Sequence, residues 1–518
     1  MQLASGLLLH ALHDQTLLQA RADDVWPWAN PPQYRWVTNP ANGDIIGRVP
    51  SPGACEASMV VNNASTAWLA WRRSSAQQRA ALLRRWHDLV LIHADDLARI
   101  ITSEQGKPLG EAHGEVIAGA AYLEWFAEEA KRTGGETRTG DSSAMRFITV
   151  RQPVGVCAAI TPWNFPLSMI TRKVAPALAA GCPVIVKPAE QTPLTALALR
   201  ELAHRAGIPP GVFNVLTADA AESVAIGNML CSHAAVQHIS FTGSTKVGRA
   251  LMRQVAPGRK RLALELGGHA PFIVFDDADF DAAIQGAMSN KFRNAGQTCV
   301  AANRLYVHDR IYDRFLVALV KATRQLKVGN GLERGVSFGP LMHEHALQKA
   351  ERHVEDALNK GARLLIGGGR LTIGPHAHRF FQPTVLADAT ADMLCAREET
   401  FGPIAPVFRF QNEAEVLLAA NATEYGLAAY LYSRDIGRIT RMAEALEFGM
   451  VGINTGRLSS EAAPFGGIKQ SGLGREGSRH GITEYLQWKT ICLDPSSGGS
   501  GSANPGVPSS PASTAALA

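Results

Sequence analysis

The 518-residue chain is poor in the features that mark several classes of protein. Its seven cysteines form no C-x-x-C pair and its histidines no cluster with zinc-ligand spacing, so we expect neither a disulfide framework nor a bound metal. No apolar run approaches the roughly 20 residues that cross a bilayer, so we expect no membrane association. The net charge of +5 is small for this length and the basic residues are scattered, which indicates no nucleic-acid partner.

The two ends of the chain also lack familiar signals. The opening MQLASGLLLHALHDQ has no basic stretch before its apolar residues and no clear small-residue cleavage site, so a signal peptide is not expected. Residues 494–518 are rich in Gly, Ser and Pro and predict a disordered tail, because they cannot bury enough apolar surface to offset the entropy of ordering. The odd number of cysteines favours a reducing, cytoplasmic location.

Apolar runs of strand length alternate with helical patterns over much of the chain. Such alternation predicts an α/β fold with parallel strands and helices on both faces, in which ligands bind beyond the carboxyl ends of the strands. A second set of similar alternations runs from about residue 271 to 456. The strands expected in the first set are residues 146–153, 155–162, 182–188, 211–217, 235–244, 261–266 and 270–275, with helices over 167–181 and 192–207. A further helix is expected over residues 280–296, where Gly296 would end it just before Cys299.

A turn between one of these strands and the next helix is a candidate phosphate site. The stretch FTGSTKVG, residues 241–248, puts Gly243 and Ser244 where backbone N–H groups at a helix start can face an anion. A glycine-containing turn of this kind is more often structural than functional. The turn alone therefore does not establish a phosphate site.

Five motifs carry a family resemblance: TPWNFP (161–166), KPAEQTP (187–193), ELGG (265–268), GQTC (296–299) and EETFGP (398–403). In this order they resemble the aldehyde dehydrogenase superfamily, over roughly residues 35 to 493. The resemblance implies a Rossmann-like NAD-binding domain, an α/β catalytic domain and a small β arm that joins a homodimer or homotetramer. The expected division is a variable segment (1–34), a dinucleotide-binding domain (35–144 and 157–267), a catalytic domain (268–456), an oligomerisation arm with the C-terminal segment (145–156 and 457–493) and the tail (494–518).

The catalytic residues follow from the resemblance and make chemical sense. It makes Cys299 the nucleophile that attacks an aldehyde carbon, whereas a small buried packing role is the ordinary interpretation of the other six cysteines. Attack creates an oxyanion, which the side-chain amide of Asn164 and the backbone N–H of Cys299 would stabilise. Glu265 is the matching general base for hydrolysis of the thioester, and a carboxylate between two leucines is costly without such a role.

The same resemblance implies NAD as the cofactor, with NADP possible. Because the carboxylate of Glu190 can accept hydrogen bonds from ribose hydroxyls but repels a 2′-phosphate, we expect a preference for NAD, which the ammonium of Lys187 tempers. Glu399 and Phe401 match positions at the nicotinamide ribose and ring. The remaining implied cofactor residues are Thr161, Pro162, Trp163, Gly243 and Ser244.

Within the superfamily the chain is most similar to succinate-semialdehyde dehydrogenases. The similarity rests on TPWNFPLSMITRK, KFRNAGQTCVAANRLYV, GINTG and APFGGIKQSGLGREGS. It implies that Arg172, Arg293 and Ser459 bind the distal carboxylate of a small-molecule semialdehyde, a task that suits the planar fork of arginine. Glutarate semialdehyde, an acyl transfer to coenzyme A and a catalytically silent protein stay open as alternatives.

Two stretches depart from the family pattern. His269, in ELGGH, stands where relatives commonly carry an amide or a lysine. The segment ADDVWPWANPPQYRW matches the usual opening strands poorly, so we expect the front of the chain to lack them.

Overall fold

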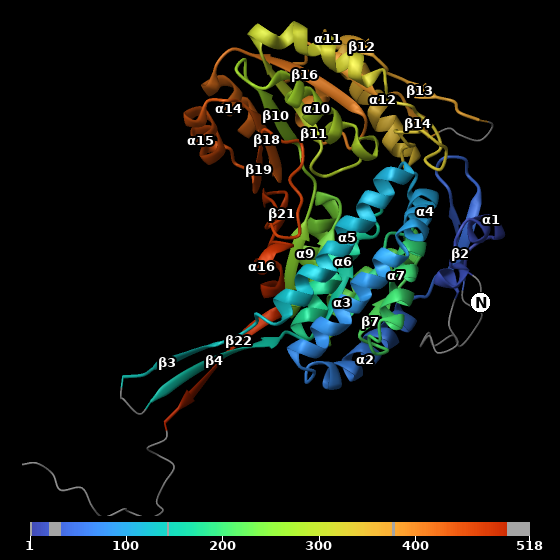
Figure 1. The fold of residues 1–518 in the computed structure, drawn as a ribbon, viewed down its shortest axis with the longest axis vertical. Helices are drawn as coiled ribbons and strands as arrows, with labels where there is room; N and C mark the ends of the chain where they lie inside the picture. Colours follow the sequence, from blue (N-terminus) through green and yellow to red (C-terminus); the bar gives the residue numbers. More distant parts are fainter. Residues whose placement is uncertain (1–2, 20–32, 142–144, 375–378, 495–518) are drawn as a thin grey trace, which may run out of the picture. The chain divides into compact units, whose positions relative to one another are not determined.

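The computed structural model describes residues 3–19, 33–141, 145–374 and 379–494 (Figure 1). The chain divides into two units, the larger comprising Met1–Arg132 and Pro153–Leu486, the smaller Thr133–Gln152 and Gln487–Ala518. The predicted tail, from residue 495 on, and all of the segment ADDVWPWANPP lie outside the described residues.

One sheet of the larger unit has six strands in the order β21-β9-β8-β5-β6-β7. Its members are β5 (Val156–Ile160), β6 (Val184–Lys187), β7 (Phe213–Val215), β8 (Val236–Thr242), β9 (Arg261–Glu265) and β21 (Gly472–Leu473). All are parallel except β21, which runs antiparallel to β9. From β5 the chain continues to β6 and β7 on one side of that strand, and from β8 it continues to β9 on the opposite side of the sheet. The loops after β5 and β8 therefore flank a switch point, the place where α/β sheets bind ligands.

Helices of the larger unit cover this sheet, and α3, α5 and α6 run side by side (Figure 1). The helix α6 is buried on every side rather than on one face, because it lies between the sheet and α5. Gly181 ends α6 with a left-handed φ of 94°, as a glycine after a helix commonly does. The helices are α1 (Gly6–His10), α2 (Ala54–Trp71), α3 (Ala76–Ile92), α4 (Ala94–Gln105), α5 (Leu109–Ala130), α6 (Ser168–Ala180), α7 (Pro193–Arg205), α8 (Ala220–Ser232) and α9 (Thr245–Val255).

A second sheet has the order β12-β15-β16-β11-β10-β18-β19 and is parallel apart from β12. It carries its own buried apolar core, separate from the core of the first sheet. The strands are β10 (Ala270–Val274), β11 (Ala302–His308), β12 (Arg363–Ile366), β15 (Thr384–Ala387), β16 (Ile404–Phe410), β18 (Ala428–Tyr432) and β19 (Met450–Ile453). Its helices are α10 (Phe280–Lys291), α11 (Tyr312–Thr323), α12 (Glu344–Asn359), α13 (Leu394–Arg397), α14 (Glu413–Asn421) and α15 (Ile436–Ala445).

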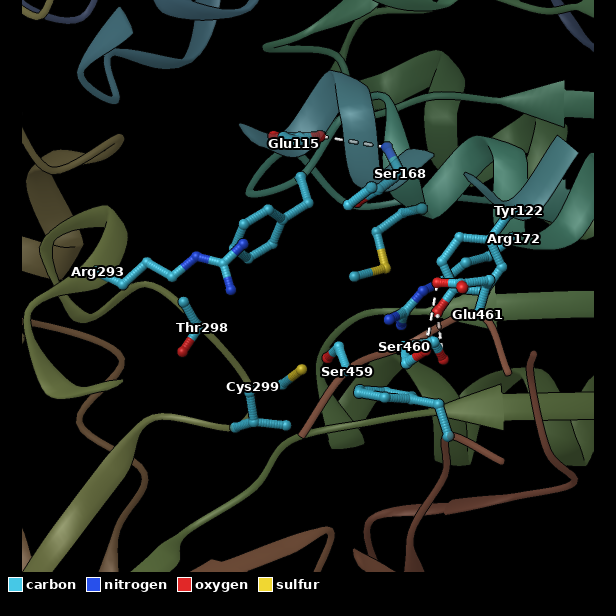
Figure 2. A pocket seen from close by; sticks show the side chains of 15 residues that line it. Glu115, Tyr122, Ser168, Arg172, Arg293, Thr298, Cys299, Ser459, Ser460 and Glu461 are labelled. Carbon is cyan, nitrogen blue, oxygen red and sulfur yellow. Dashed lines mark hydrogen bonds between the residues drawn. The ribbon is translucent and has the colours of Figure 1, made fainter. Parts of the chain in front are cut away.

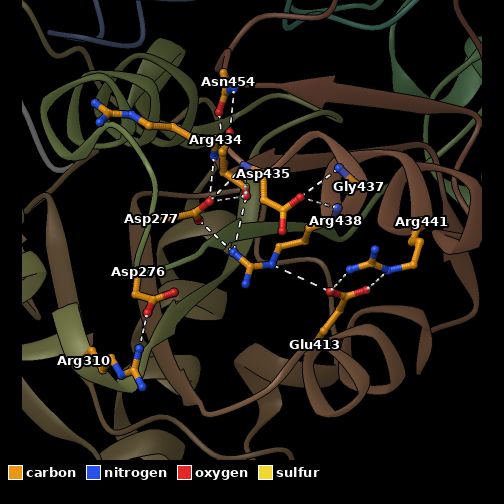
Figure 3. A network of polar contacts seen from close by, with 11 residues as sticks. Asp276, Asp277, Arg310, Glu413, Arg434, Asp435, Gly437, Arg438, Arg441 and Asn454 are labelled. Carbon is orange, nitrogen blue, oxygen red and sulfur yellow. Dashed lines mark hydrogen bonds and ion pairs between the residues drawn. The ribbon is translucent and has the colours of Figure 1, made fainter.

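An ionic network closes the carboxyl end of this second sheet (Figure 3). Oδ2 of Asp277 accepts hydrogen bonds from the backbone N–H groups of Arg434 and Asp435, and its Oδ1 accepts one from Arg438 at 2.8 Å. Asp435 in turn caps the first turn of α15. Because these carboxylates already have donors, this edge is structural, and the chemistry must be sought elsewhere.

The front of the chain forms two strands, so the expectation that they are missing is wrong. β1 (Tyr34–Thr38) and β2 (Ile45–Pro50) pair antiparallel. Val37, Ile46 and Val49 are buried in the apolar core of the first sheet, a set of contacts that a weak family match did not reveal.

The three-stranded sheet β22-β4-β3 includes the strands of the smaller unit. It consists of β3 (Glu136–Thr139), β4 (Arg146–Pro153) and β22 (Leu486–Leu493). After its first residue β22 is exposed throughout, and it presents Trp488, Ile491 and Leu493 to solvent. An edge strand that exposes large apolar side chains is a natural surface for pairing with another chain.

Candidate active site

The loop that carries Cys299 is built from strained backbone between α10 and β11. The structure ends α10 at Lys291, before the predicted end at Gly296, because Asn294 and Ala295 take left-handed φ values of 49° and 54°. Gly296 continues the turn at φ 75°, and a Cβ there would lie 2.2 Å from the carbonyl oxygen of Gly402. Strain of this kind persists where surrounding contacts fix the chain, often at functional sites.

Cys299 borders two pockets of the larger unit. The first encloses about 310 Å³ and follows the switch point of the six-stranded sheet. Among the expected cofactor residues, those that line it are Pro162, Trp163, Gly243, Ser244, Glu399 and Phe401. The structure does not place Thr161, Lys187 or Glu190 in its lining.

The second pocket is smaller, about 80 Å³, and holds the expected substrate residues (Figure 2). Arg172, Arg293 and Ser459 all line it together with Cys299. Figure 2 shows the two guanidinium groups reaching toward the pocket from different sides, with the Cys299 thiol below them. Sequence reasoning missed Glu461, whose carboxylate belongs to the same lining.

The guanidinium of Arg172 is buried, and two of its three nitrogens lack a hydrogen-bond partner among the described residues. It stacks on the ring of Phe465 at 4.1 Å and faces the ring of Tyr122 at 5.0 Å. Its nearest carboxylate oxygen, Oε2 of Glu476, is 3.7 Å away, too far for a hydrogen bond. Among the described residues, Nε and Nη1 of Arg172 have no acceptor. Burial opposes the charge, but Tyr122 and Glu476 together hold the pKa of Arg172 above its ordinary value.

Asn164 is buried at the border of the first pocket. Its Nδ2 donates a hydrogen bond of 3.0 Å to the carbonyl oxygen of Gln297, in the loop that leads to Cys299. A carboxamide carries two N–H donors, so this bond leaves one of them for another acceptor. The arrangement brings an amide donor next to the nucleophile loop.

Glu265 ends β9 with a carboxyl group that is only 4% exposed. Neither of its oxygens has a hydrogen-bond partner among the described residues. Burial, and then the nearby carboxylate of Glu476, raise the pKa of Glu265 well above its usual value. Glu265 lines neither of the two pockets at Cys299, but its charge acts on the Cys299 thiol. A buried carboxyl group that is close to a nucleophile and lacks a hydrogen-bond partner among the described residues is a candidate for proton transfer.

The surroundings of Cys299 favour the protonated thiol over the thiolate. Burial, followed by the carboxylates of Glu265 and Glu399, raises its pKa to about 12, and the charge of Arg172 opposes this only in part. The residue is nevertheless partly exposed, so a substrate can reach it. Thiolate formation at Cys299 therefore requires a proton acceptor or added positive charge in the pocket.

The two glycines of ELGG permit close approach of the surrounding groups. A Cβ on Gly267 would lie 2.8 Å from Oε2 of Glu399, and one on Gly268 would lie 2.2 Å from the carbonyl oxygen of Cys299. The N–H of Gly268 donates to Oε1 of Glu399 at 2.9 Å. Burial raises the pKa of Glu399 to about 7. Any side chain at these glycines would push Glu399 and the Cys299 loop apart.

Several buried polar residues near the site were not predicted. The ammonium of Lys173 donates to Oγ of Ser240 at 2.9 Å and also pairs with Glu476. His269, the residue that departs from the family pattern in ELGGH, is fully buried, and its Nε2 forms a hydrogen bond of 2.9 Å with the carbonyl oxygen of Ala396 in α13. Its role is therefore structural. A pattern of helical charges looks the same whether the charges face solvent or the interior, so the sequence held no signal for these residues.

None of the helices in the described ranges combines the length and the apolar character needed to cross a membrane. In the same ranges no three side chains of the types His, Cys, Asp or Glu gather as metal ligands.

Comparisons with known proteins point to one family. A model of the aldehyde dehydrogenase family matches residues 28–491. The chain is 56% identical to 3-sulfolactaldehyde dehydrogenase of Pseudomonas putida, over 93% of this chain and 98% of that one. It is 56% identical to succinate-semialdehyde dehydrogenase [NADP(+)] of Escherichia coli K12, over 93% and 99% of the two chains. It is 55% identical to glutarate-semialdehyde dehydrogenase of Pseudomonas aeruginosa, over 92% and 97%.

The solved structures agree. The crystal structure of succinate-semialdehyde dehydrogenase from Burkholderia pseudomallei superposes with a TM-score of 0.90 at 55% identity, over 93% of this chain and all of that one. A likeness at this level covers both sheets of the larger unit.

Proposed function

The chain belongs to the aldehyde dehydrogenase family, and we propose that this oxidoreductase converts succinate semialdehyde to succinate with Cys299 as its nucleophile. The single observation that carries the choice of substrate is Arg172. It offers two donor nitrogens that have no acceptor in the described part of the chain, inside a pocket that Cys299 also lines. A substrate carboxylate is the acceptor that such a buried guanidinium lacks.

The proposed reaction begins when the thiol of Cys299 loses its proton to solvent water. The thiolate sulfur then forms a C–S bond to the aldehyde carbon, and the electron pair of the carbonyl π bond moves to oxygen. The amide of Asn164 and the backbone N–H of Cys299 stabilise this oxyanion as it develops. A nicotinamide cofactor held by the residues of the first pocket would supply the hydride acceptor for the former aldehyde carbon, and Cys299 would then carry the thioester. Glu265 then removes a proton from water, the water oxygen attacks the thioester, and the C–S bond breaks to release the acid.

The residues of the first pocket fit a nicotinamide dinucleotide. Gly243 and Ser244 stand at the start of α9, where backbone N–H groups suit a pyrophosphate, and Ser244 caps the helix through its Oγ. Glu399 and Phe401 lie at the Cys299 end of the same pocket. The family uses NAD(P), and we propose a preference for NAD.

Glu190 supports that preference. Although burial acts against ionisation, its own backbone N–H and the ammonium of Lys187, 3.9 Å away, lower the pKa of Glu190, so the group is a carboxylate at neutral pH. Like charge then disfavours a 2′-phosphate beside it. Two relatives carry NADP(+) in their names, which makes the comparison of both cofactors necessary.

Glutarate semialdehyde is the second candidate substrate, because relatives at 54–55% identity bear that name. One methylene separates the two aldehydes, and such a difference is typically worth about 1–3 kcal/mol of discrimination. Transfer of the acyl group to coenzyme A is disfavoured by Glu265, since hydrolysis needs a base that thiol transfer does not.

The test is steady-state NADH and NADPH formation over a panel of aldehydes with and without a distal carboxylate. We expect the highest kcat/KM for succinate semialdehyde with NAD, and no requirement for coenzyme A. A higher kcat/KM for butanal, which has no carboxylate, would overturn the substrate proposal.

We also propose that the exposed strand β22 joins copies of the chain into a homodimer or homotetramer through the predicted arm (145–156 and 457–493). The division into a dinucleotide-binding domain and a catalytic domain rests on the two separate cores described above. A reducing, cytoplasmic location suits a catalytic thiol, which oxidation would inactivate.

A further inference from the structure

We propose that Lys107, paired with Glu115, is a positioning residue whose ammonium clamps the backbone of Asn164 and thereby fixes the oxyanion donor against the Cys299 loop. The inference rests on the oxyanion role proposed for Asn164. It assigns a task to a buried ion pair that the reaction steps above do not use.

The ammonium of Lys107 is completely enclosed. Its side chain is 0% exposed in the turn between α4 and α5. Nζ donates to Oε2 of Glu115 at 2.6 Å and to the carbonyl oxygen of Asn164 at 2.7 Å, and it lies 3.9 Å from the centre of the Phe165 ring. Burial lowers the pKa of Lys107, and Glu115 counters that effect.

Glu115 ties the pair to the start of α6. Its Oε1 accepts the backbone N–H groups of Leu167 at 2.9 Å and Ser168 at 3.2 Å, the orphan donors of the first helical turn (Figure 2). One carboxylate therefore holds both the ammonium and the helix that carries Arg172. The ion pair spans α5, the PWNF segment and α6.

Asn164 is held from three directions. Its carbonyl oxygen accepts from Lys107 Nζ and, at 2.9 Å, from Nδ2 of Asn294, while its own Nδ2 donates to Gln297. Gln105 closes the ring: its Nε2 donates to Oδ1 of Asn294 at 3.0 Å, and its Oε1 accepts the N–H of Lys107 at 2.9 Å. The clamp thus connects Asn164 to the left-handed residue Asn294 of the nucleophile loop.

A merely stabilising role does not explain this choice of residues. Buried ion pairs gain little stability over apolar side chains of similar volume, because desolvation cancels most of the attraction. They do fix geometry, since each partner must keep its donors and acceptors in place. Fixing the amide of Asn164 is worth much here, because misplacement of a catalytic group by about 1 Å can cost roughly a hundredfold in rate.

The test compares a charge-balanced variant with a matched control. Lys107→Met with Glu115→Gln removes both charges while a Gln oxygen still accepts from the α6 N–H groups. Lys131→Met with Glu128→Gln removes an exposed pair, 2.8 Å apart, at the end of the same helix α5. We measure first-turnover NADH formation with succinate semialdehyde and with butanal, together with NADH affinity by fluorescence.

We expect the buried double variant to slow the first turnover roughly ten- to hundredfold for both aldehydes, with NADH affinity unchanged, and the control to stay near wild type. Combined with Asn164→Ala, the buried variant should cause no further loss, because Lys107 acts through Asn164. Glu115→Gln alone is the fallback if the double variant does not fold, and its smaller loss should likewise vanish in the Asn164→Ala background.

Three results would overturn the clamp: activity within about threefold of wild type, losses that multiply with those of Asn164→Ala, or a loss confined to succinate semialdehyde. A different result separates the clamp from its premise. If Asn164→Ala alone leaves the first turnover unchanged, the oxyanion role of Asn164 fails, whatever the Lys107 variants do.

Discussion

Replacing Arg172 with methionine should reduce the advantage that a distal carboxylate gives a substrate. Methionine keeps an unbranched stem for packing on Phe465 and Tyr122, and it removes the guanidinium whose Nε and Nη1 have no acceptor. A hydrogen bond to a charged group is worth about 1.5–3 kcal/mol. Because every 1.4 kcal/mol corresponds to tenfold, kcat/KM for succinate semialdehyde should fall roughly 10- to 150-fold.

Butanal supplies the internal control for this prediction. Arg172 also lowers the pKa of the Cys299 thiol in part, so its loss affects both substrates, and only the ratio of their kcat/KM values isolates the carboxylate contact. The exposed Arg324→Met, outside both pockets at Cys299, controls for loss of a positive charge. Equal losses on both aldehydes would refute the reasoning and leave Arg172 a structural role.

Three further changes test other groups. Glu265→Gln should give a burst of about one NADH per active site and then slow turnover. In the unmodified enzyme, deacylation should speed up as pH rises through the elevated pKa of Glu265. If the Glu265→Gln variant showed the same dependence of deacylation on pH, Glu265 would not be the base. Glu190→Ser should shift the ratio of kcat/KM for NAD over NADP toward NADP, and an unchanged ratio would show that Glu190 does not contact the ribose. Glu104→Gln should raise the melting temperature above that of the wild type, by an amount that grows between pH 5 and pH 8. Burial raises the pKa of Glu104 to about 8, so the folded state keeps a proton that the unfolded state loses above about pH 4.5. The free energy of unfolding of the wild type therefore falls by up to about 1.4 kcal/mol per pH unit over that window. A constant difference in melting temperature would instead show that the N–H groups of Leu194 and Thr195 keep Glu104 ionised.

The sequence was sufficient for the five parallel strands of the first sheet and for the motifs around them. Short apolar runs and glycine stops predict β5 to β9 within a few residues, because fully buried parallel strands are apolar throughout. The strand predicted at 270–275 is β10, which belongs to the second sheet rather than to the first set, and the two-residue β21 was not predicted. The prediction for the segment before Cys299 was wrong, because the left-handed turn at Asn294 and Ala295 depends on contacts with distant segments. Propensity alone continues the helix there.

The buried polar residues were predicted less well from the sequence than the strands were. Lys107 and Glu115 stand in a pattern that fits exposed helix faces equally well, and only their burial against Asn164 distinguishes them. β1 and β2 were missed for a related reason, because their buried side chains pack on residues far along the chain.

Trapping the acyl-enzyme tests the central claim most directly. Glu265→Gln, mixed with succinate semialdehyde and NAD and quenched in acid, should carry one succinyl group per chain, and peptide mass spectrometry should place it on Cys299. The same experiment with Cys299→Ala should give neither the adduct nor NADH. An adduct on another residue, or full NADH formation by Cys299→Ala, would contradict the account.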